Sequence, residues 1–136
     1  MKMKIKIDPG AKMPTRAHPW DAGLDLYAKE DGKVFGSAVF DTGVHVQIPH
    51  GYYGEIRSRS GLLFKHDLTT DGTIDSNYNG SIKVKLVNHL KYPYMVQAGD
   101  KIAQLVIVPC LLPELELVDS LEETDRGDGG FGSTGR

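Results

Sequence analysis

Residues 72–88 read Gly72-Thr73-Ile74-Asp75-Ser76-Asn77-Tyr78-Asn79-Gly80-Ser81-Ile82-Lys83-Val84-Lys85-Leu86-Val87-Asn88, and this stretch decides the fold. Apolar side chains at positions 82, 84 and 86 alternate with mostly polar ones, which is the period of a half-buried strand. Asparagine and glycine at positions 77, 79 and 80 tolerate positive φ, so we expect a hairpin between Ile74 and Ser81. Asp75 and Tyr78 then lie near the bend, although a plain surface turn fits the same residues.

Short strands separated by turn signals fill most of the remaining chain. Alternation or a continuous apolar run marks residues 2–7, 21–28, 34–40, 42–48, 52–58 and, after a turn, 99–108. Within 21–28, Leu24 and Leu26 share one face, so Asp25 is expected on the solvent side. The pattern predicts an all-β, jelly-roll-like β-sandwich or barrel. We expect a core domain over residues 1–118 and a flexible, glycine-rich C-terminal arm over residues 119–136.

Composition limits the classes of function. A chain of 136 residues with a net charge of −2 fits one domain and has no basic footprint for nucleic acid. The longest apolar run, residues 105–112, is broken by Pro109 and is too short to cross a membrane. Cys110 is the single cysteine, so we expect no intrachain disulfide and a cytoplasmic location. The histidine and cysteine spacing matches no zinc site, and we expect no metal held by protein ligands alone.

Two further segments carry groups suited to binding phosphate. Ser60 is expected to be the N-cap of a short helix that follows Arg59, where a guanidinium, a hydroxyl and free N–H groups form an anion site. An ordinary capped turn fits the same residues. Gln104 interrupts an apolar strand, so its amide either bridges backbone groups or points into a site.

The last eleven residues, 126–136, include five glycines and have the composition of a mobile segment. The segment nevertheless carries two arginines, two hydroxyls and one aromatic ring, at Arg126, Phe131, Ser133, Thr134 and Arg136. Glycines can wrap backbone N–H groups around phosphates, which favours a binding arm. A disordered, solubilising tail is the competing interpretation.

Five segments together resemble the ordered motifs of the trimeric deoxyuridine triphosphatases. They are residues 22–26 (Ala-Gly-Leu-Asp-Leu), 59–61 (Arg-Ser-Gly), 72–78 (Gly-Thr-Ile-Asp-Ser-Asn-Tyr), 99–105 (Gly-Asp-Lys-Ile-Ala-Gln-Leu) and 126–135 (Arg-Gly-Asp-Gly-Gly-Phe-Gly-Ser-Thr-Gly). The resemblance covers the chain from residue 22 onward, and five matches in order are far more specific than one. It implies a β jelly roll, a homotrimer with shared active sites, and Mg²⁺-dependent hydrolysis of dUTP to dUMP and pyrophosphate, which supplies dUMP for thymidylate synthesis.

The resemblance also implies a role for each matched residue. Asp75 would activate the attacking water, and Tyr78 would pack under the deoxyribose. The phosphates would be held by Arg59, Ser60, Gly61 and Gln104. Lys83 would approach the nucleotide. Uracil would be recognised by the backbone of Gly72, Thr73 and Ile74. Phe131 would stack on the base while Arg126, Ser133 and Thr134 close over the phosphates. Asp25 would belong to the surroundings of the metal without binding it directly, because Mg²⁺ is held mainly by substrate phosphates and water.

The sequence departs from the family pattern at two places. Ser58 stands where proline usually precedes Arg-Ser-Gly, and residues 68–72 are short and lack an asparagine that many members place near uracil. A dCTP deaminase would share the fold and the trimer, but it fits the Asp75 and Tyr78 segment and the arm poorly. The sequence also leaves room for a regulatory protein that uses this fold to bind a protein partner, and for a structural β-sandwich with accidental motifs.

Overall fold

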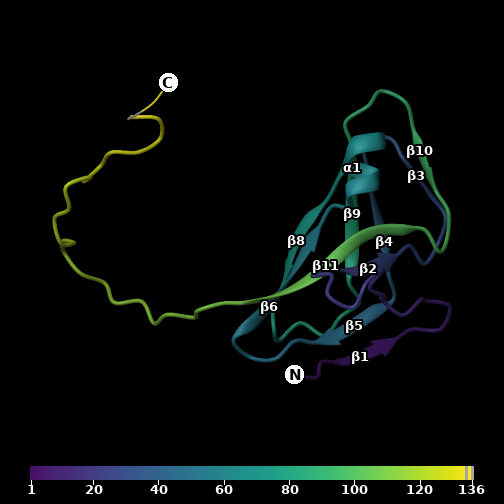
Figure 1. Cartoon of the computed structure of the whole chain (residues 1–136), viewed down its shortest axis with the longest axis horizontal. Helices are drawn as coiled ribbons and strands as arrows, with labels where there is room; N and C mark the ends of the chain where they lie inside the picture. The colour runs from purple at the N-terminus through teal and green to yellow at the C-terminus, as the bar shows by residue number, and fades with distance from the viewer. Residues whose placement is uncertain (134, 136) are drawn as a thin grey trace.

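A computed structural model describes residues 1–133 and 135 and consists of short strands with one short helix (Figure 1). The strands are β1 Lys4–Ile7, β2 Leu24–Tyr27, β3 Gly32–Val34, β4 Ser37–Asp41, β5 Val44–Gln47, β6 Tyr52–Arg57, β7 Leu68–Thr69, β8 Asp71–Ile74, β9 Lys83–Asn88, β10 Tyr94–Val96 and β11 Lys101–Pro109. The helix, α1, spans Ser60–His66. The predicted all-β class is confirmed.

The strands form two main sheets and two smaller ladders. One sheet has the order β2-β11-β6-β8 and the other β4-β9-β7, while β1 pairs with β5 and β10 with β3. All of these pairings are antiparallel. Within the described residues the sheets are open and no closed barrel is formed. Of the two predicted forms, sandwich or barrel, the structure is therefore a sandwich.

The hydrophobic core lies between the two main sheets. Ile82, Val84 and Leu86 are almost fully buried, as their alternation predicts, and they pack in one cluster with Leu26 of β2 and Leu105 of β11. The neighbouring residues of β9 at positions 83 and 85 are exposed. Burial of one face of each strand therefore sets the register of the sandwich.

The predicted hairpin between Ile74 and Ser81 is wrong. β8 pairs with β6 and β9 pairs with β4 and β7, so residues 75–82 cross from one sheet to the other. The local turn chemistry is present, since Tyr78 N–H donates to the Asp75 carbonyl at 3.0 Å. What the local pattern could not reveal is the pairing partner, because the buried faces of β8 and β9 belong to different layers.

Three smaller expectations also need correction. The strand expected over residues 34–40 is divided into β3 and β4 at Gly36, whose φ of 76° breaks the ladder. Asp25 is buried rather than solvent-facing, since its carboxylate has cationic partners within the protein. Ser60 is the first helical residue, and the N-cap is Arg59, which makes no side-chain capping bond.

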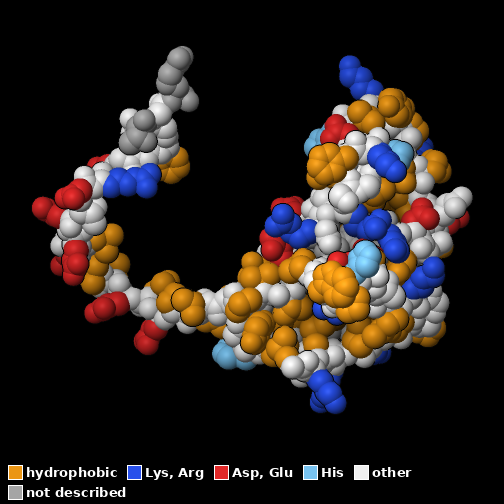
Figure 2. Space-filling view, viewed as in Figure 1, with side chains coloured by type: hydrophobic (Ala, Val, Ile, Leu, Met, Phe, Trp, Pro, Cys, Tyr) orange, Lys and Arg blue, Asp and Glu red, His pale blue; other side chains and the backbone are white. Residues whose placement is uncertain are grey.

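The chain beyond β11 leaves the body as an extended arm (Figure 1). Leu111, Leu115 and Leu117 are each at least 90% exposed, and apolar and acidic side chains stand along the arm away from the body (Figure 2). Because β11 ends at Pro109, residues 110–118 lie outside the strands, and the predicted domain boundary after residue 118 remains a prediction. None of the helices in the described part of the chain has the length and apolar character to span a membrane.

Candidate active site

Strand pairing brings three of the predicted phosphate-site residues together. β11 lies between β2 and β6, and its Gln104 pairs with Asp25 on one side and Arg57 on the other. Arg59 follows two residues after the end of β6 and is the N-cap of α1. A recess of about 300 Å³ lies at this junction, lined by Gly23, Asp25, Arg59, Ser60 and Gln104 among others.

Asp25 is the electrostatic centre of this recess. Arg59 Nε donates to Asp25 Oδ1 at 3.0 Å, and Lys101 Nζ lies 3.4 Å from Asp25 Oδ2. The carboxylate is almost buried, whereas Arg59 and Lys101 keep 30% and 40% of their side chains exposed. One anion thus holds two cations whose outer atoms still face solvent, which suits them to grip a phosphate. Lys101 lies within the matched 99–105 segment, but the sequence alone assigns it no role.

Gln104 is fixed by its backbone neighbours. Its Nε2 donates to the Ser58 carbonyl at 3.0 Å, and a Cβ on Gly23 would overlap Gln104 Oε1. A side chain at position 23 would therefore force the Gln104 amide out of its present position. The amide thus makes one backbone hydrogen bond and also lines the recess, and its role in a binding site stays a prediction.

Ser58 performs a task that sequence reasoning missed. Its hydroxyl donates to the Thr70 carbonyl at 3.1 Å and accepts from the Thr70 N–H at 2.9 Å. These bonds join the start of α1 to the residue that precedes β8. A proline at position 58 would fix the backbone but would lack this hydroxyl. The only sequence signal was the departure from the usual proline.

Asp75 and Tyr78 lie on the crossing segment, away from the recess. Asp75 is exposed, and the backbone bond between the two residues closes a tight turn. Tyr78 is 43% exposed, and its hydroxyl donates to the Ser81 carbonyl at 2.8 Å. A Cβ on Gly80 would overlap the Tyr78 ring, so glycine there allows the ring to lie over the backbone. The Asp75 carboxylate and part of the Tyr78 side chain are thus exposed to solvent.

Most of the remaining predicted contacts around the crossing segment are exposed, namely Gly72, Thr73 and Lys83. Gly72 and Thr73 lie in β8, opposite Ile56 and Glu55 of β6, and Lys83 begins β9. A Cβ at position 72 would make ordinary contact with Ile56 at 3.6 Å, so packing alone does not require glycine there. Ile74 is half-buried against the core and holds the end of β8 in place.

The structure does not bring the arm to the other residues. The hydrogen bonds of described residues 124–133 lie within the arm, among them Gly129 N–H to the Arg126 carbonyl at 2.9 Å. Phe131 is fully exposed with φ of 50°, and Ser133 is also exposed. Thr134 lies outside the described residues. Within one chain, the recess, the crossing segment and the arm are three separate groups of predicted site residues.

The recess contains few ligands for a metal. Among the residues that the structure describes, no three His, Cys, Asp or Glu side chains form a metal-binding cluster. Asp25 and Gln104 supply carboxylate and amide oxygens, the type of ligand that Mg²⁺ prefers. Both Asp25 oxygens are already paired with Arg59 and Lys101, so a magnesium ion near this recess would take its ligands mainly from phosphate and water.

We expect Asp25→Asn to destabilise the fold by about 1 to 2 kcal/mol, because Arg59 and Lys101 would lose the charge that pairs them. The two cations are partly exposed, which keeps the cost below that of a fully buried pair. Urea unfolding monitored by circular dichroism measures the change. Glu30→Gln, at an exposed acidic position, is the matched control and should leave the midpoint unchanged. Equal midpoints for all three proteins would show that Asp25 does not stabilise this junction.

Comparison with known proteins places these features in a family. A family model described as dUTPase matches residues 10–135. The deoxyuridine 5'-triphosphate nucleotidohydrolase of Gloeothece citriformis is 45% identical over 141 residues, covering 99% of this chain and 97% of that enzyme. The dUTPase of Staphylococcus bacteriophage 80alpha with dUPNHPP has a TM-score of 0.90 at 33% identity, covering 99% of each chain.

A second solved structure resembles the chain closely. A point mutant of the dUTPase from phage phi11 of S. aureus, described with a structural Mg(II) ion, has a TM-score of 0.83 at 32% identity. The match covers 90% of this chain and 100% of that one. The match of the family model over nearly the whole chain, together with these relatives and the fold, shows that the chain belongs to the dUTPase family.

Proposed function

We propose that this chain hydrolyses dUTP to dUMP and pyrophosphate by the attack of a water molecule on the α-phosphate, with Asp75 as the general base. The main support is the recess that presents the Arg59 guanidinium, together with a separate, exposed carboxylate at Asp75, in a chain of this family. Phosphoryl transfer depends mainly on positioning and on neutralising spread negative charge. A carboxylate at hydrogen-bond distance from a water can accept its proton during attack.

The recess is the proposed site for the phosphates. Arg59 lines the recess and supplies positive charge, and Ser60 and Gln104 supply uncharged polar groups there. Lys101 does not line the recess but pairs with the same Asp25 carboxylate. The Asp25 carboxylate acts through Arg59 by fixing the direction of its guanidinium, which leaves other N–H groups free for phosphate oxygens. Gly61, at the exposed start of the short helix, adds backbone that a phosphate can approach.

Magnesium is the proposed cofactor. When bound, it would neutralise charge on the phosphate oxygens and favour departure of pyrophosphate. Asp25 is the residue of this chain that would lie near the ion, through water or through the groups it orients. The phi11 neighbour is described with a structural Mg(II), which supports magnesium use within this fold but leaves the location of a catalytic ion to experiment.

A homotrimer with shared active sites is the proposed assembly. The recess, the crossing segment and the arm lie apart in one chain, and each is exposed. Leucines at 111, 115 and 117 on the arm are uncovered, a pattern typical of surfaces that pack on another subunit. Residues from different subunits could then complete one site. In this arrangement Lys83 and the backbone of residues 72–74 would bind nucleoside, while Arg126, Phe131, Ser133 and Thr134 would close over it.

Tyr78→Ala should reduce the preference for dUTP over UTP, since the ring is proposed to occupy the space of a 2′-hydroxyl. It should also weaken dUTP binding, because Tyr78 is 43% exposed and its ring is proposed to pack on the sugar. The ratio of kcat/KM values for dUTP and UTP measures the effect. Tyr92→Ala removes another exposed tyrosine and is the control. An unchanged ratio in the Tyr78 variant would show that another group excludes the ribonucleotide.

The proposed function is tested by pyrophosphate release from dUTP, dTTP, dCTP and UTP, with the products separated by nucleotide chromatography. We expect rapid release from dUTP alone and dUMP as the product. Formation of dUTP from dCTP would indicate a deaminase instead.

The reaction is proposed to be cytoplasmic, where dUMP is available for thymidylate synthesis.

A further inference from the structure

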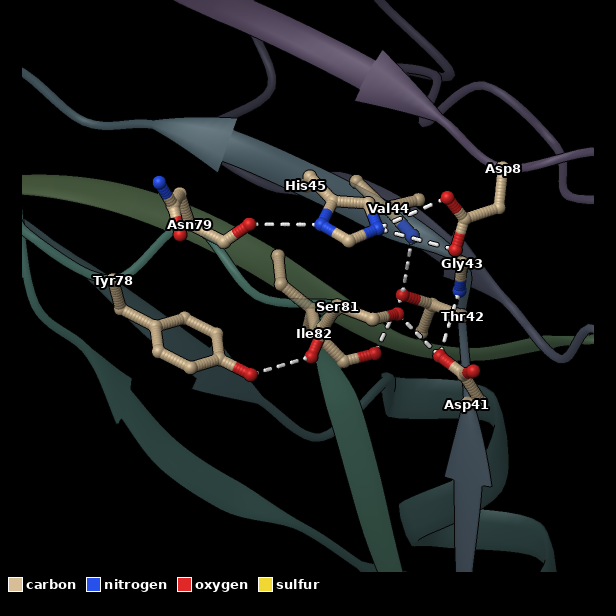
Figure 3. Close-up of polar contacts among 10 residues, drawn as sticks. All are labelled: Asp8, Asp41, Thr42, Gly43, Val44, His45, Tyr78, Asn79, Ser81 and Ile82. Carbon is tan, nitrogen blue, oxygen red and sulfur yellow. Dashed lines mark hydrogen bonds and ion pairs between the residues drawn. The ribbon is translucent and has the colours of Figure 1, made fainter.

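His45 connects the crossing segment to Asp8, the residue that follows β1. It lies in β5, and its Nδ1 is 2.8 Å from the Asn79 carbonyl oxygen. Its Nε2 is 3.1 Å from both carboxylate oxygens of Asp8, the residue that follows β1 (Figure 3). The side chain is 20% exposed. Asn79 directly follows Tyr78, so this ring contacts the segment that carries the proposed sugar-binding residue.

The two partners of His45 determine its protonation state in this geometry. A backbone carbonyl and a carboxylate both accept hydrogen bonds and cannot donate them. Both contacts are satisfied together only when both ring nitrogens donate, which is the imidazolium form. A neutral ring would direct a lone pair at one of the two oxygens, and one contact would become unfavourable.

The β4–β5 turn holds the rest of the crossing segment through further bonds (Figure 3). Thr42 Oγ1 donates to the Ile82 carbonyl at 2.6 Å, and Ile82 N–H donates to the Val44 carbonyl at 2.8 Å. The Ser81 hydroxyl donates to Asp41 Oδ1. These contacts fix residues 81–82, at the end of the segment. Among the contacts drawn in Figure 3, the His45 bond is the one nearest in sequence to Tyr78 that comes from the β4–β5 side.

We propose that protonated His45 is a positioning residue that clamps the Asp75–Tyr78 turn, so that nucleotide turnover weakens when this histidine loses its proton. The inference rests on the function proposed for Asp75 and Tyr78. His45 touches neither of these side chains and acts through the Asn79 backbone and the Tyr78–Asn79 peptide. Its effect should therefore appear in the pH profile rather than as complete loss of activity.

Other charged groups near His45 determine the direction of its titration. The bond to the Asn79 carbonyl, followed by the bond to Asp8, raises the pKa of His45 above its ordinary value of 6.5, against burial and Lys6. Lys6 is its cross-strand partner on β1. Lys4 and Lys6 line, with His45 and Asn79, a second cavity of about 440 Å³ that is distinct from the recess at Asp25. On the β4 side, the Ser81 hydrogen bond lowers the pKa of Asp41 against partial burial.

The sign of the pH effect follows from this raised pKa. The clamp is complete below pH 6.5 and is lost as the pH rises through the higher value in the folded protein. We therefore expect kcat/KM for dUTP to fall by about tenfold on the alkaline side, because a small displacement of positioned groups has an effect of this order. The hydrogen bond from Ser81 to Asp41 does not weaken as the pH rises, because the Asp41 carboxylate stays ionised.

Three variants of the full chain test the clamp from about pH 6 to about pH 9. His45→Gln cannot donate at once to the Asn79 carbonyl and to the Asp8 carboxylate at any pH. Its kcat/KM should therefore be low at every pH and lack the alkaline decrease. Asp8→Asn removes the charge opposite Nε2 and should move the decrease to lower pH. His89→Gln is the matched control at an exposed histidine beyond the far end of β9, and it should keep the wild-type profile.

Nitrogen NMR of the His45 ring tests the clamp without relying on activity. Two protonated ring nitrogens at about pH 6, with a titration midpoint that falls in Asp8→Asn, would support it. A neutral ring at that pH, or the same alkaline decrease in His45→Gln as in wild type, would overturn it. An absence of dUTP hydrolysis by the wild-type chain would instead refute the proposed function and would leave the NMR result as a separate test.

Discussion

Asp75→Asn lowers turnover of dUTP by about 100-fold or more while nucleotide affinity stays close to wild type, if Asp75 is the general base. Asparagine has nearly the same shape but cannot accept a proton from water. The side chain is exposed, and it is the Asp75 backbone carbonyl that accepts the bond from Tyr78 N–H, so the turn should survive the substitution. Single-turnover kinetics measure the rate, and titration with a slowly hydrolysed dUTP analogue measures the affinity.

The control for this variant is Asp71→Asn. Asp71 is an exposed aspartate at the start of β8, four residues before Asp75, so it changes the charge by the same amount in the same region. We expect it to keep nearly full activity. Turnover of Asp75→Asn within about threefold of wild type would remove Asp75 from the role of base and direct attention to another water-activating group.

Deletion of residues 126–136 lowers dUTP hydrolysis by orders of magnitude while preserving the fold, the proposed trimer and the thermal midpoint. The described bonds of this segment lie within the arm, and Phe131 is fully exposed, so its removal takes nothing from the core. The activity would fall because the site loses both the exclusion of water and part of the phosphate grip. Sedimentation, melting and steady-state rates on the truncated chain measure these three quantities.

Closure of the arm can be observed directly. Phe131→Trp, made in a Trp20→Phe background, places the single indole of the chain on the arm, because Trp20 is the only natural tryptophan. Saturation with a slowly hydrolysed dUTP analogue should change its fluorescence as the indole stacks on uracil. Full activity of the truncated chain, with no fluorescence change in the reporter, would show that the arm is a passive extension.

The order of residues along the chain determined the class of the protein and most of its candidate site. Alternation at positions 82, 84 and 86 places one face of β9 in the core, because side chains on a strand point alternately to its two faces. The five motifs are likewise properties of residue order. They identified the dUTPase family before the positions of Asp75, Arg59 or Gln104 in space were known. Information of this kind is local, or depends on short patterns that can be read one after another.

Only the tertiary structure decided which segments meet. Residues 72–88 read as a hairpin because turn residues separate two strands, yet β8 and β9 pair in different sheets. Asp25 read as a solvent-facing residue, yet Arg59 and Lys101 converge on it. His45 carried no motif, and its role depends on Asp8 and Asn79, which are distant in sequence. In each case the stabilising contact is made with a residue far along the chain. Periodicity within a short stretch of sequence therefore cannot identify that partner.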